Sequence, residues 1–217
     1  MYLVVHIPKT AGSSLRWALE KYHGKSRVIR DYGPQSIVTD RVVHEHVYGK
    51  DKPGVSAQFV DAMTEGKSRV LVGHFPLQKY AGYFEPEQII TVMREPLLRA
   101  CSEYVHRINN KTFKGSVTDF LQKPVNQNLQ TRFLNGISER SFIGIAEQYR
   151  ETLDLINDMT RWRLLCRRKN IGYRGGGQTL AESLTEQELD LFYKLNQKDI
   201  ELYQDAKQRF NSRDLQT

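Results

Sequence analysis

The first 24 residues place a short apolar run, a compact polar loop and an amphipathic segment in direct succession. The apolar run extends from Tyr2 to Val5 and favours a buried strand. Beyond the loop, apolar residues recur at helical spacing, at Leu15, Ala18, Leu19 and Tyr22. The pattern ends near Gly24, so the sequence predicts a strand, a tight loop and a helix, the opening unit of an α/β fold.

The loop of this unit is rich in small and polar residues and reads His6-Ile7-Pro8-Lys9-Thr10-Ala11-Gly12-Ser13-Ser14. Gly12 lets a ligand approach the backbone, and Ser13 or Ser14 can cap the helix. The free N–H groups of the first helical turn and the Lys9 ammonium both attract anions. The loop therefore predicts a site for a phosphate or sulfate ester, and a turn with a solvated lysine is the plainer alternative. It is not a Walker A loop, because Lys9 precedes Gly12.

The size and charge of the chain limit the classes of partner. With 217 residues and 39% hydrophobic content, we expect one domain over 1–217, ending in a polar tail at about 211–217. The net charge of +7 favours an anionic partner: a nucleotide, an acidic glycan or nucleic acid. Because the chain lacks a continuous basic stripe and a recognisable reading module, we do not expect it to bind nucleic acid.

The cysteines and the hydropathy pattern indicate a compartment. Cys101 and Cys166 are the only cysteines, and we expect both to be buried free thiols in a reducing environment. The sequence contains neither a run of about 18 apolar residues nor a signal peptide. These features predict a cytoplasmic protein with no membrane partner.

A second predicted strand, Arg69 to Val72, leads directly into Gly73-His74-Phe75-Pro76. Open parallel sheets keep their active sites at the carboxyl ends of their strands, which is where His74 falls. Gly73 and Pro76 predict a fixed, narrow turn that directs the imidazole into a cleft. A histidine held by structural hydrogen bonds is the alternative.

A third predicted strand, Gln88 to Met93, is followed by Arg94 and by a helix that opens at Pro96. The segment from Arg94 to Tyr104 fits the pattern R-x-P-x-x-R-x-x-S-x-Y at every fixed position, with Ser102 as its serine. A guanidinium offers two parallel donors to phosphate oxygens, and a serine hydroxyl adds a neutral donor. The joint spacing of Arg94 and Ser102 therefore predicts a second phosphate site.

The remaining segments give weaker predictions. Asn126 to Leu134 carries four side-chain amides and an arginine, which must face solvent or line a polar cleft. His44 and His46 would share one face of a strand, but no third ligand follows, so we expect a surface strand or acceptor-side loop and no metal site. We expect a last strand at Trp162 to Cys166, and either a linker or a functional loop in the glycine-rich residues 170–178. The long helical segment after Thr185 is expected to fray beyond Phe210.

Taken together, these motifs resemble the sulfotransferases that use 3′-phosphoadenosine 5′-phosphosulfate (PAPS). The loop at 6–14 is similar to the HIPKTAG[ST]S loop of the carbohydrate branch, and residues 73–76 resemble the catalytic histidine segment of heparan and uronosyl 2-O-sulfotransferases. The segment 94–104 resembles the family's second signature, and residues 128–134 and 142–147 resemble its NxQTRxL and fiGltE phrases.

The resemblance implies a fold, a reaction and roles for particular residues. The fold would be the P-loop-NTPase-like sulfotransferase fold, with a central parallel sheet flanked by helices. The enzyme would move a sulfuryl group from PAPS to an acceptor hydroxyl of a carbohydrate, without a metal. The implied donor-site residues are Lys9, Thr10, Ala11, Gly12, Ser13, Ser14, Arg94, Ser102, Tyr173 and Arg174. The implied catalytic residues are His74, as general base, and Lys9, and the implied acceptor-side residues are Gln130, Arg132 and His44.

Two other classes of function stay open at this point. A P-loop kinase or NTPase would use a similar strand, loop and helix, but it needs a lysine inside the loop proper and an acidic residue at a strand end to hold Mg²⁺. A non-catalytic binder of nucleotides or acidic glycans would keep the basic groove without needing His74.

Overall fold

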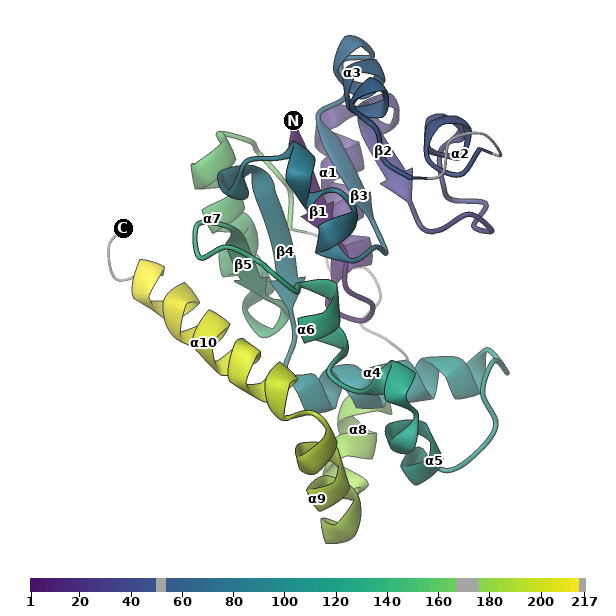
Figure 1. The fold of residues 1–217 in the computed structure, drawn as a ribbon. Helices are drawn as coiled ribbons and strands as arrows, with labels where there is room; N and C mark the ends of the chain where they lie inside the picture. Colours follow the sequence, from purple (N-terminus) through teal and green to yellow (C-terminus); the bar gives the residue numbers. More distant parts are fainter. Residues whose placement is uncertain (50–53, 167–175, 215–217) are drawn as a thin grey trace.

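The fold is known from a computed structural model that describes residues 1–49, 54–166 and 176–214. Its centre is a five-stranded parallel sheet with the strand order β2-β3-β1-β4-β5 (Figure 1). The strands are β1 (Tyr2–Val5), β2 (Val28–Asp31), β3 (Val70–Gly73), β4 (Ile89–Met93) and β5 (Phe142–Ile145). In register, Val4 of β1 lies between Val72 of β3 and Ile90 of β4. The predicted parallel sheet is confirmed.

Helices cover the sheet and extend beyond one end of it (Figure 1). They are α1 (Gly12–His23), α2 (Arg41–His46), α3 (Ala57–Glu65), α4 (Pro96–Asn109), α5 (Val117–Gln122), α6 (Leu129–Phe133), α7 (Tyr149–Thr160), α8 (Gly176–Ser183), α9 (Glu186–Leu195) and α10 (Gln197–Asp214). Because helices pack on the sheet, every residue of β3, β4 and β5 is buried, which explains why these strands read as continuous apolar runs. No helix in the described parts of the chain is both long and apolar enough to cross a membrane.

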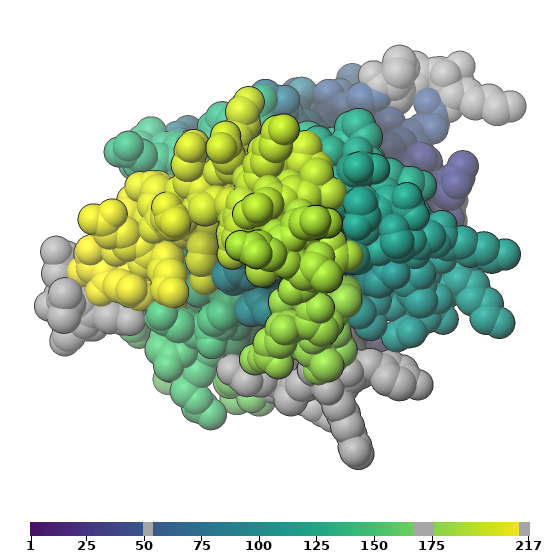
Figure 2. Space-filling view, turned by 90° about the horizontal axis from the view of Figure 1, so that it is seen from below, coloured from purple at the N-terminus to yellow at the C-terminus, as the bar shows by residue number. Residues whose placement is uncertain are grey.

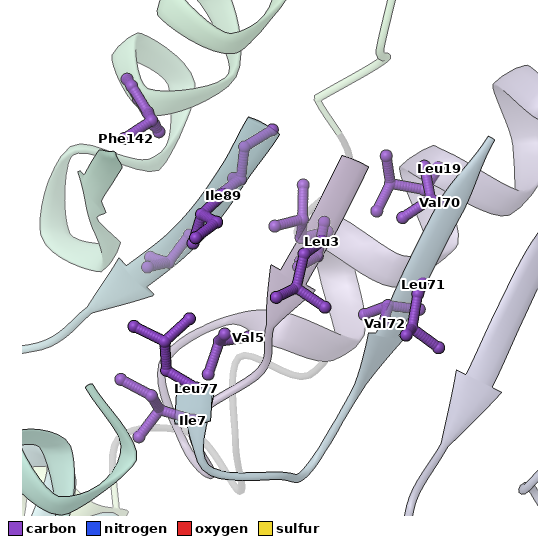
Figure 3. Packing of buried hydrophobic residues seen from close by; sticks show 14 of the residues in the cluster. Leu3, Val5, Ile7, Leu19, Val70, Leu71, Val72, Leu77, Ile89 and Phe142 are labelled. Atoms are coloured by element: carbon purple, nitrogen blue, oxygen red, sulfur yellow. The ribbon is translucent and has the colours of Figure 1, made fainter. Parts of the chain in front are cut away.

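The buried apolar side chains form two clusters. The larger cluster lies on the sheet, and Figure 3 shows part of it, with Leu3, Val70 and Ile89 from neighbouring strands and Leu19 from α1. The smaller cluster lies between α4, α5, α8 and α9 and contains Cys101, Phe120 and Phe192. These four helices gather below the carboxyl ends of the strands, and the view of that end shows the segment from α8 to α10 across its middle, with α4 and α5 beside it (Figures 1 and 2).

Several local predictions are wrong. The segment around Val42 and Val43 is a helix, α2, and not a strand, and the described residues 162–166 form no strand. Cys101 is buried, whereas Cys166 is exposed and lies in neither a strand nor a helix. The last helix, α10, continues past Phe210 to Asp214, so the expected fraying is not seen over 211–214, and residues 215–217 lie outside the described residues.

The amide side chains at the start of the segment 126–134 are held by bonds to the main chain. The Asn126 side chain donates to the Phe120 carbonyl, and the Asn128 side chain donates to the Leu195 carbonyl. For Asn126, which is 4% exposed, the expected position in solvent or in a polar cleft is therefore wrong, since this buried amide finds its partner in the fold itself.

Asp199 of α10 ties this segment to the C-terminal helices. Its carboxylate accepts hydrogen bonds from the backbone N–H groups of Gln130 (3.1 Å) and Thr131 (2.7 Å) and from the Thr131 hydroxyl (2.8 Å). Asp199 is only 1% exposed. One buried carboxylate thus fixes the start of α6 against α10.

Replacing Asp199 by alanine should destabilise the protein, because it leaves buried donors of α6 unpaired. We expect a loss of about 3 kcal/mol in the free energy of unfolding, measured by urea denaturation. The exposed Asp190 of α9 offers a matched control, and Asp190→Ala should change this free energy by less than about 0.5 kcal/mol. Equal effects of the two substitutions would contradict a stabilising role of Asp199.

Candidate functional site

The order of the strands places a topological switch point at the carboxyl ends of β1 and β4. The chain leaves β1 toward β2 on one side of the sheet and leaves β4 toward β5 on the other side. Open α/β sheets bind ligands at such a switch point, outside the carboxyl ends of the strands. The loop after β1 and the Arg94 segment after β4 both begin there, so the topology brings the two predicted phosphate sites to one edge of the sheet.

The loop after β1 has an unusual backbone. Lys9 and Ala11 have φ angles of 70° and 66°, in the left-handed region that residues other than glycine rarely adopt. Such strained residues cluster at functional sites, and left-handed turns direct backbone N–H groups toward a bound anion. Ala11 precedes the first residue of α1 and caps it without a side-chain bond, so the expected cap from Ser13 or Ser14 is wrong. Both serines instead lie in the first helical turn.

The side chains of Thr10 and Lys9 have different roles in the loop. The Thr10 hydroxyl is buried and donates to the Ile7 carbonyl at 2.9 Å, so it stabilises the loop. Lys9 is half-buried, and burial lowers the pKa of its ammonium group, an effect that Glu103 opposes and nearby Arg94 increases. Within the described ranges, no hydrogen bond or ion pair engages its Nζ atom. An anion bound next to Lys9 would offset the cost of burying this charge.

Arg94 contacts the loop directly. Its Nη1 atom donates to the Lys9 carbonyl at 3.3 Å, and its Nε atom lies 3.8 Å from a carboxylate oxygen of Glu147. The backbone of Arg94 is held by the buried side chain of Gln130, whose Oε1 accepts from the Arg94 N–H (3.0 Å) and whose Nε2 donates to its carbonyl (2.8 Å). Both ends of the Gln130 amide are thereby engaged by the backbone of Arg94.

The other residue of the second phosphate site, Ser102, lies on α4 against α8. A β-carbon at Gly177 would come within 2.8 Å of the Ser102 α-carbon, so only glycine allows the two helices to approach this closely. Tyr173 and Arg174, predicted to cover the donor, lie outside the described residues. Glu103, the neighbour of Ser102, raises the pKa of both Lys9 and His74, so its charge acts on the loop after β1 and on the turn after β3.

His74 follows β3, where the sequence predicted it. Its backbone N–H donates to the Asp31 carbonyl at 2.9 Å, which fixes the turn. The ring is partly open to solvent, but the protein around it displaces enough water to lower its pKa to about 4; Glu103 acts in the opposite direction and Arg16 in the same direction. The ring of the unliganded protein is therefore neutral at pH 7.

Two predicted acceptor-side residues lie apart from these contacts. Arg132 is exposed on α6 and donates to the Val125 carbonyl. His44 lies on α2, where His46 cannot share its face because residues two apart on a helix point in different directions. The described residues contain no group of three or more His, Cys, Asp or Glu side chains that could hold a metal ion.

The sequence analysis missed a buried network around Asp31, the last residue of β2. Its carboxylate is fully buried and binds the Lys79 ammonium (2.6 Å) and the hydroxyl groups of Tyr48 (2.8 Å) and Tyr80 (2.7 Å). These contacts hold the pKa of Asp31 below its usual value against the effect of burial. An acidic residue at a strand end was a usable signal, although its partners lie 17 to 49 residues away.

Comparison with known proteins gives only remote likeness. No protein-family model and no curated protein matches the chain. Among solved structures, a sulfotransferase from Alicyclobacillus acidocaldarius is similar with a TM-score of 0.48 and 13% identity, covering 89% of this chain and 94% of that one. A retinol dehydratase in complex with androsterone and the inactive cofactor PAP is similar with a TM-score of 0.34 and 13% identity, covering 91% and 64%. Likeness at this level does not assign a function.

The histidines predict how stability depends on pH. Burial lowers the pKa of His6 well below its usual value, and it lowers those of His23 and His74 to about 4. In the unfolded chain each pKa returns to about 6.5, so between pH 6.5 and 4 the unfolded state binds more protons. We therefore expect the urea midpoint to fall as the pH is lowered from 7 to 5, with His74 contributing less because its ring is partly exposed.

The variant His23→Gln provides the control for this prediction, since it removes one of the three groups and should make the decline shallower. Asp31, whose pKa is lowered, acts only at more acidic pH, below about 4. A midpoint that stays constant or rises between pH 7 and 5 would contradict the assignment.

Proposed function

We propose that this chain is a sulfotransferase that transfers the sulfuryl group of PAPS to an acceptor hydroxyl, with a carbohydrate as the acceptor. The contact between the Arg94 guanidinium and the Lys9 carbonyl carries the proposal. It joins two segments 85 residues apart, each of which the sequence associates with one phosphate of the same donor. The segment that carries His74 follows β3, which is the other neighbour of β1 in the sheet, so it begins beside the loop.

In the proposed donor site, the two phosphate ends bind to different elements. The loop from Lys9 to Ser14 would hold the 5′-phosphosulfate with its ammonium group and with the first N–H groups of α1. Arg94 and Ser102 would hold the 3′-phosphate, which distinguishes this donor from ATP. Gln130 would act here as a positioning residue, because its amide fixes the backbone of Arg94. Tyr173 and Arg174 keep their proposed place over the nucleotide.

The reaction needs a base and stabilisation of the leaving group. The neutral ring of His74 would take the proton of the acceptor hydroxyl as its oxygen attacks sulfur, while the bond from sulfur to the bridging oxygen breaks and the bisphosphate departs. The negative charge of the donor would raise the pKa of His74 from its low value toward the working pH, where a general base is most effective. Lys9 would stabilise the charge that develops on the leaving phosphate. Arg132 and His44 remain proposed acceptor-side residues.

The contacts of the acidic residues support a kinase or NTPase function less well than the proposed sulfotransferase function. Glu95, next to Arg94, uses its carboxylate to cap α4, accepting from the N–H groups of Leu97 and Leu98. Asp31, at the end of β2, is engaged by Lys79 and two tyrosines. Neither carboxylate is free to take the metal-holding role that such enzymes give to an acidic residue at a strand end.

A transfer assay tests the proposed reaction. With sulfur-labelled PAPS and a panel of glycans, we expect labelled product that persists in EDTA and that falls by about 10²- to 10⁴-fold in His74→Ala, since the base is lost. His23→Ala, at the far end of α1, is the matched control and should retain the wild-type rate at 25 °C. Tight nucleotide binding without turnover on any acceptor would favour the non-catalytic binder instead.

A binding measurement tests the donor site separately. Removing the guanidinium in Arg94→Ala should raise the Kd of the desulfonated nucleotide, 3′-phosphoadenosine 5′-phosphate (PAP), by about 10- to 100-fold in calorimetry, because a charged hydrogen bond is lost. The exposed Arg140, which pairs with Glu87, offers the control Arg140→Ala, which should bind PAP like the wild type. Equal affinity of wild type and Arg94→Ala would remove Arg94 from the donor site.

A further inference from the structure

Three rings from three strand ends meet beside the loop. His6 follows β1, Tyr32 follows β2 and His74 follows β3. The ring centroids of His6 and His74 are 4.3 Å apart with planes at 69°, and those of Tyr32 and His74 are 4.6 Å apart at 62°. Both contacts have the edge-to-face geometry that aromatic rings prefer. The His74 ring is thus in contact with one ring from the end of β1 and one from the end of β2.

The two supporting rings are bonded to each other. The Tyr32 hydroxyl and the Nδ1 atom of His6 lie 2.9 Å apart, within hydrogen-bond distance. Burial lowers the pKa of His6, so its ring is neutral at pH 7 and its Nδ1 can accept the hydroxyl proton. A fixed separation of His6 and Tyr32 follows from this bond.

The backbone and neighbouring side chains hold each supporting ring in turn. A β-carbon at Gly12 would lie 1.7 Å from the His6 ring, so His6 fills the space that glycine leaves at the start of α1. On the other side, the Arg16 guanidinium lies over the Tyr32 ring at 5.1 Å, and the Tyr32 N–H donates to the Thr39 hydroxyl at 2.9 Å. His6 and Tyr32 are therefore anchored to α1 and to the residues that follow β2.

His74 itself has no comparable anchor. Throughout the described segments, no hydrogen bond reaches its imidazole, and only its backbone N–H is bonded. The orientation of the ring therefore depends on what it packs against. A base must lie within hydrogen-bond reach of the proton it removes, so this orientation matters for the proposed reaction.

We propose that His6 and Tyr32 are positioning residues for His74: their hydrogen-bonded pair sets the orientation of the His74 ring and links it to the donor loop through Gly12. The catalytic part of this inference rests on the proposed function, whereas the orientation of the ring does not. Neither residue needs to touch the donor or the acceptor. His6 thereby gains a role that the sequence analysis did not give it.

Nuclear magnetic resonance of the full-length chain, labelled with ¹⁵N-histidine, tests the orientation without any substrate. His74→Ala assigns the His74 signal. In Tyr32→Leu, which removes one supporting ring, we expect the Hε1 signal to lose its ring-current shift and the pKa of His74 to move from its lowered value toward 6.5. Tyr32→Phe keeps the ring but loses the bond to His6, so it should change the Nδ1 signal of His6 and shift the Hε1 signal of His74 by less than Tyr32→Leu does.

Tyr22→Leu is the matched control, since Tyr22 is an exposed tyrosine at the far end of α1, and it should leave the His74 signal unchanged. Circular dichroism checks that each variant is folded. An unchanged His74 shift and pKa in folded Tyr32→Leu would overturn the proposal.

Kinetics distinguish this inference from the proposed function. In Tyr32→Leu we expect kcat to fall by about 10- to 100-fold with an unchanged Kd for PAP, because only the base is misplaced. If wild type transfers sulfate and Tyr32→Leu keeps its full kcat, the positioning role is wrong. If the His74 signal responds as expected but wild type transfers nothing, the ring arrangement stands and the proposed function fails.

Discussion

The hydrogen bond from Arg94 to the Lys9 carbonyl holds the loop after β1 against the segment after β4. It can form only because β1 and β4 are neighbours in the sheet, so that the loop after one strand faces the segment after the other. Gln130 fixes the backbone of Arg94, and Asp199 fixes the backbone of Gln130. A series of hydrogen bonds therefore connects α10, through Gln130 and Arg94, to the loop after β1. The position of Arg94 relative to this loop depends on these bonds.

Two cations and two carboxylates lie near the contact between Arg94 and the loop after β1. Lys9 is partly buried with its ammonium unpaired by any described residue, and Arg94 lies next to it. Placing two cations close together in a partly buried site costs free energy unless nearby negative charge compensates. Glu103 supplies part of this compensation, since it raises the pKa of both Lys9 and His74. Glu147, with a carboxylate oxygen 3.8 Å from the Arg94 Nε atom, supplies another part, so two carboxylates act on these two cations.

Much of the fold could be predicted from the sequence where one physical signal acts alone. Buried strands such as β3 read as continuous apolar runs because helices cover both faces of the sheet. Prediction failed where signals conflict, as at Val42 and Val43, which are β-branched but belong to the six-residue helix α2. It also failed for contacts distant in sequence: the partners of Asp31 and the burial of Asn126 depend on the tertiary arrangement. Motifs in the sequence identified the candidate residues, whereas the residues that hold them in place could be identified only from the structure.

The separate apolar cluster of α4, α5, α8 and α9 has a consequence for how the molecule opens. A group of helices with its own interior can exchange its amide protons as one cooperative unit, at a lower free energy than the sheet. Lys9 lies in the loop after β1, at the edge of the sheet, and Ser102 lies on α4, in this group of helices. A ligand that contacted both residues would oppose local opening of the helices relative to the sheet. The amide exchange rates of these two regions would then become more alike in the presence of that ligand.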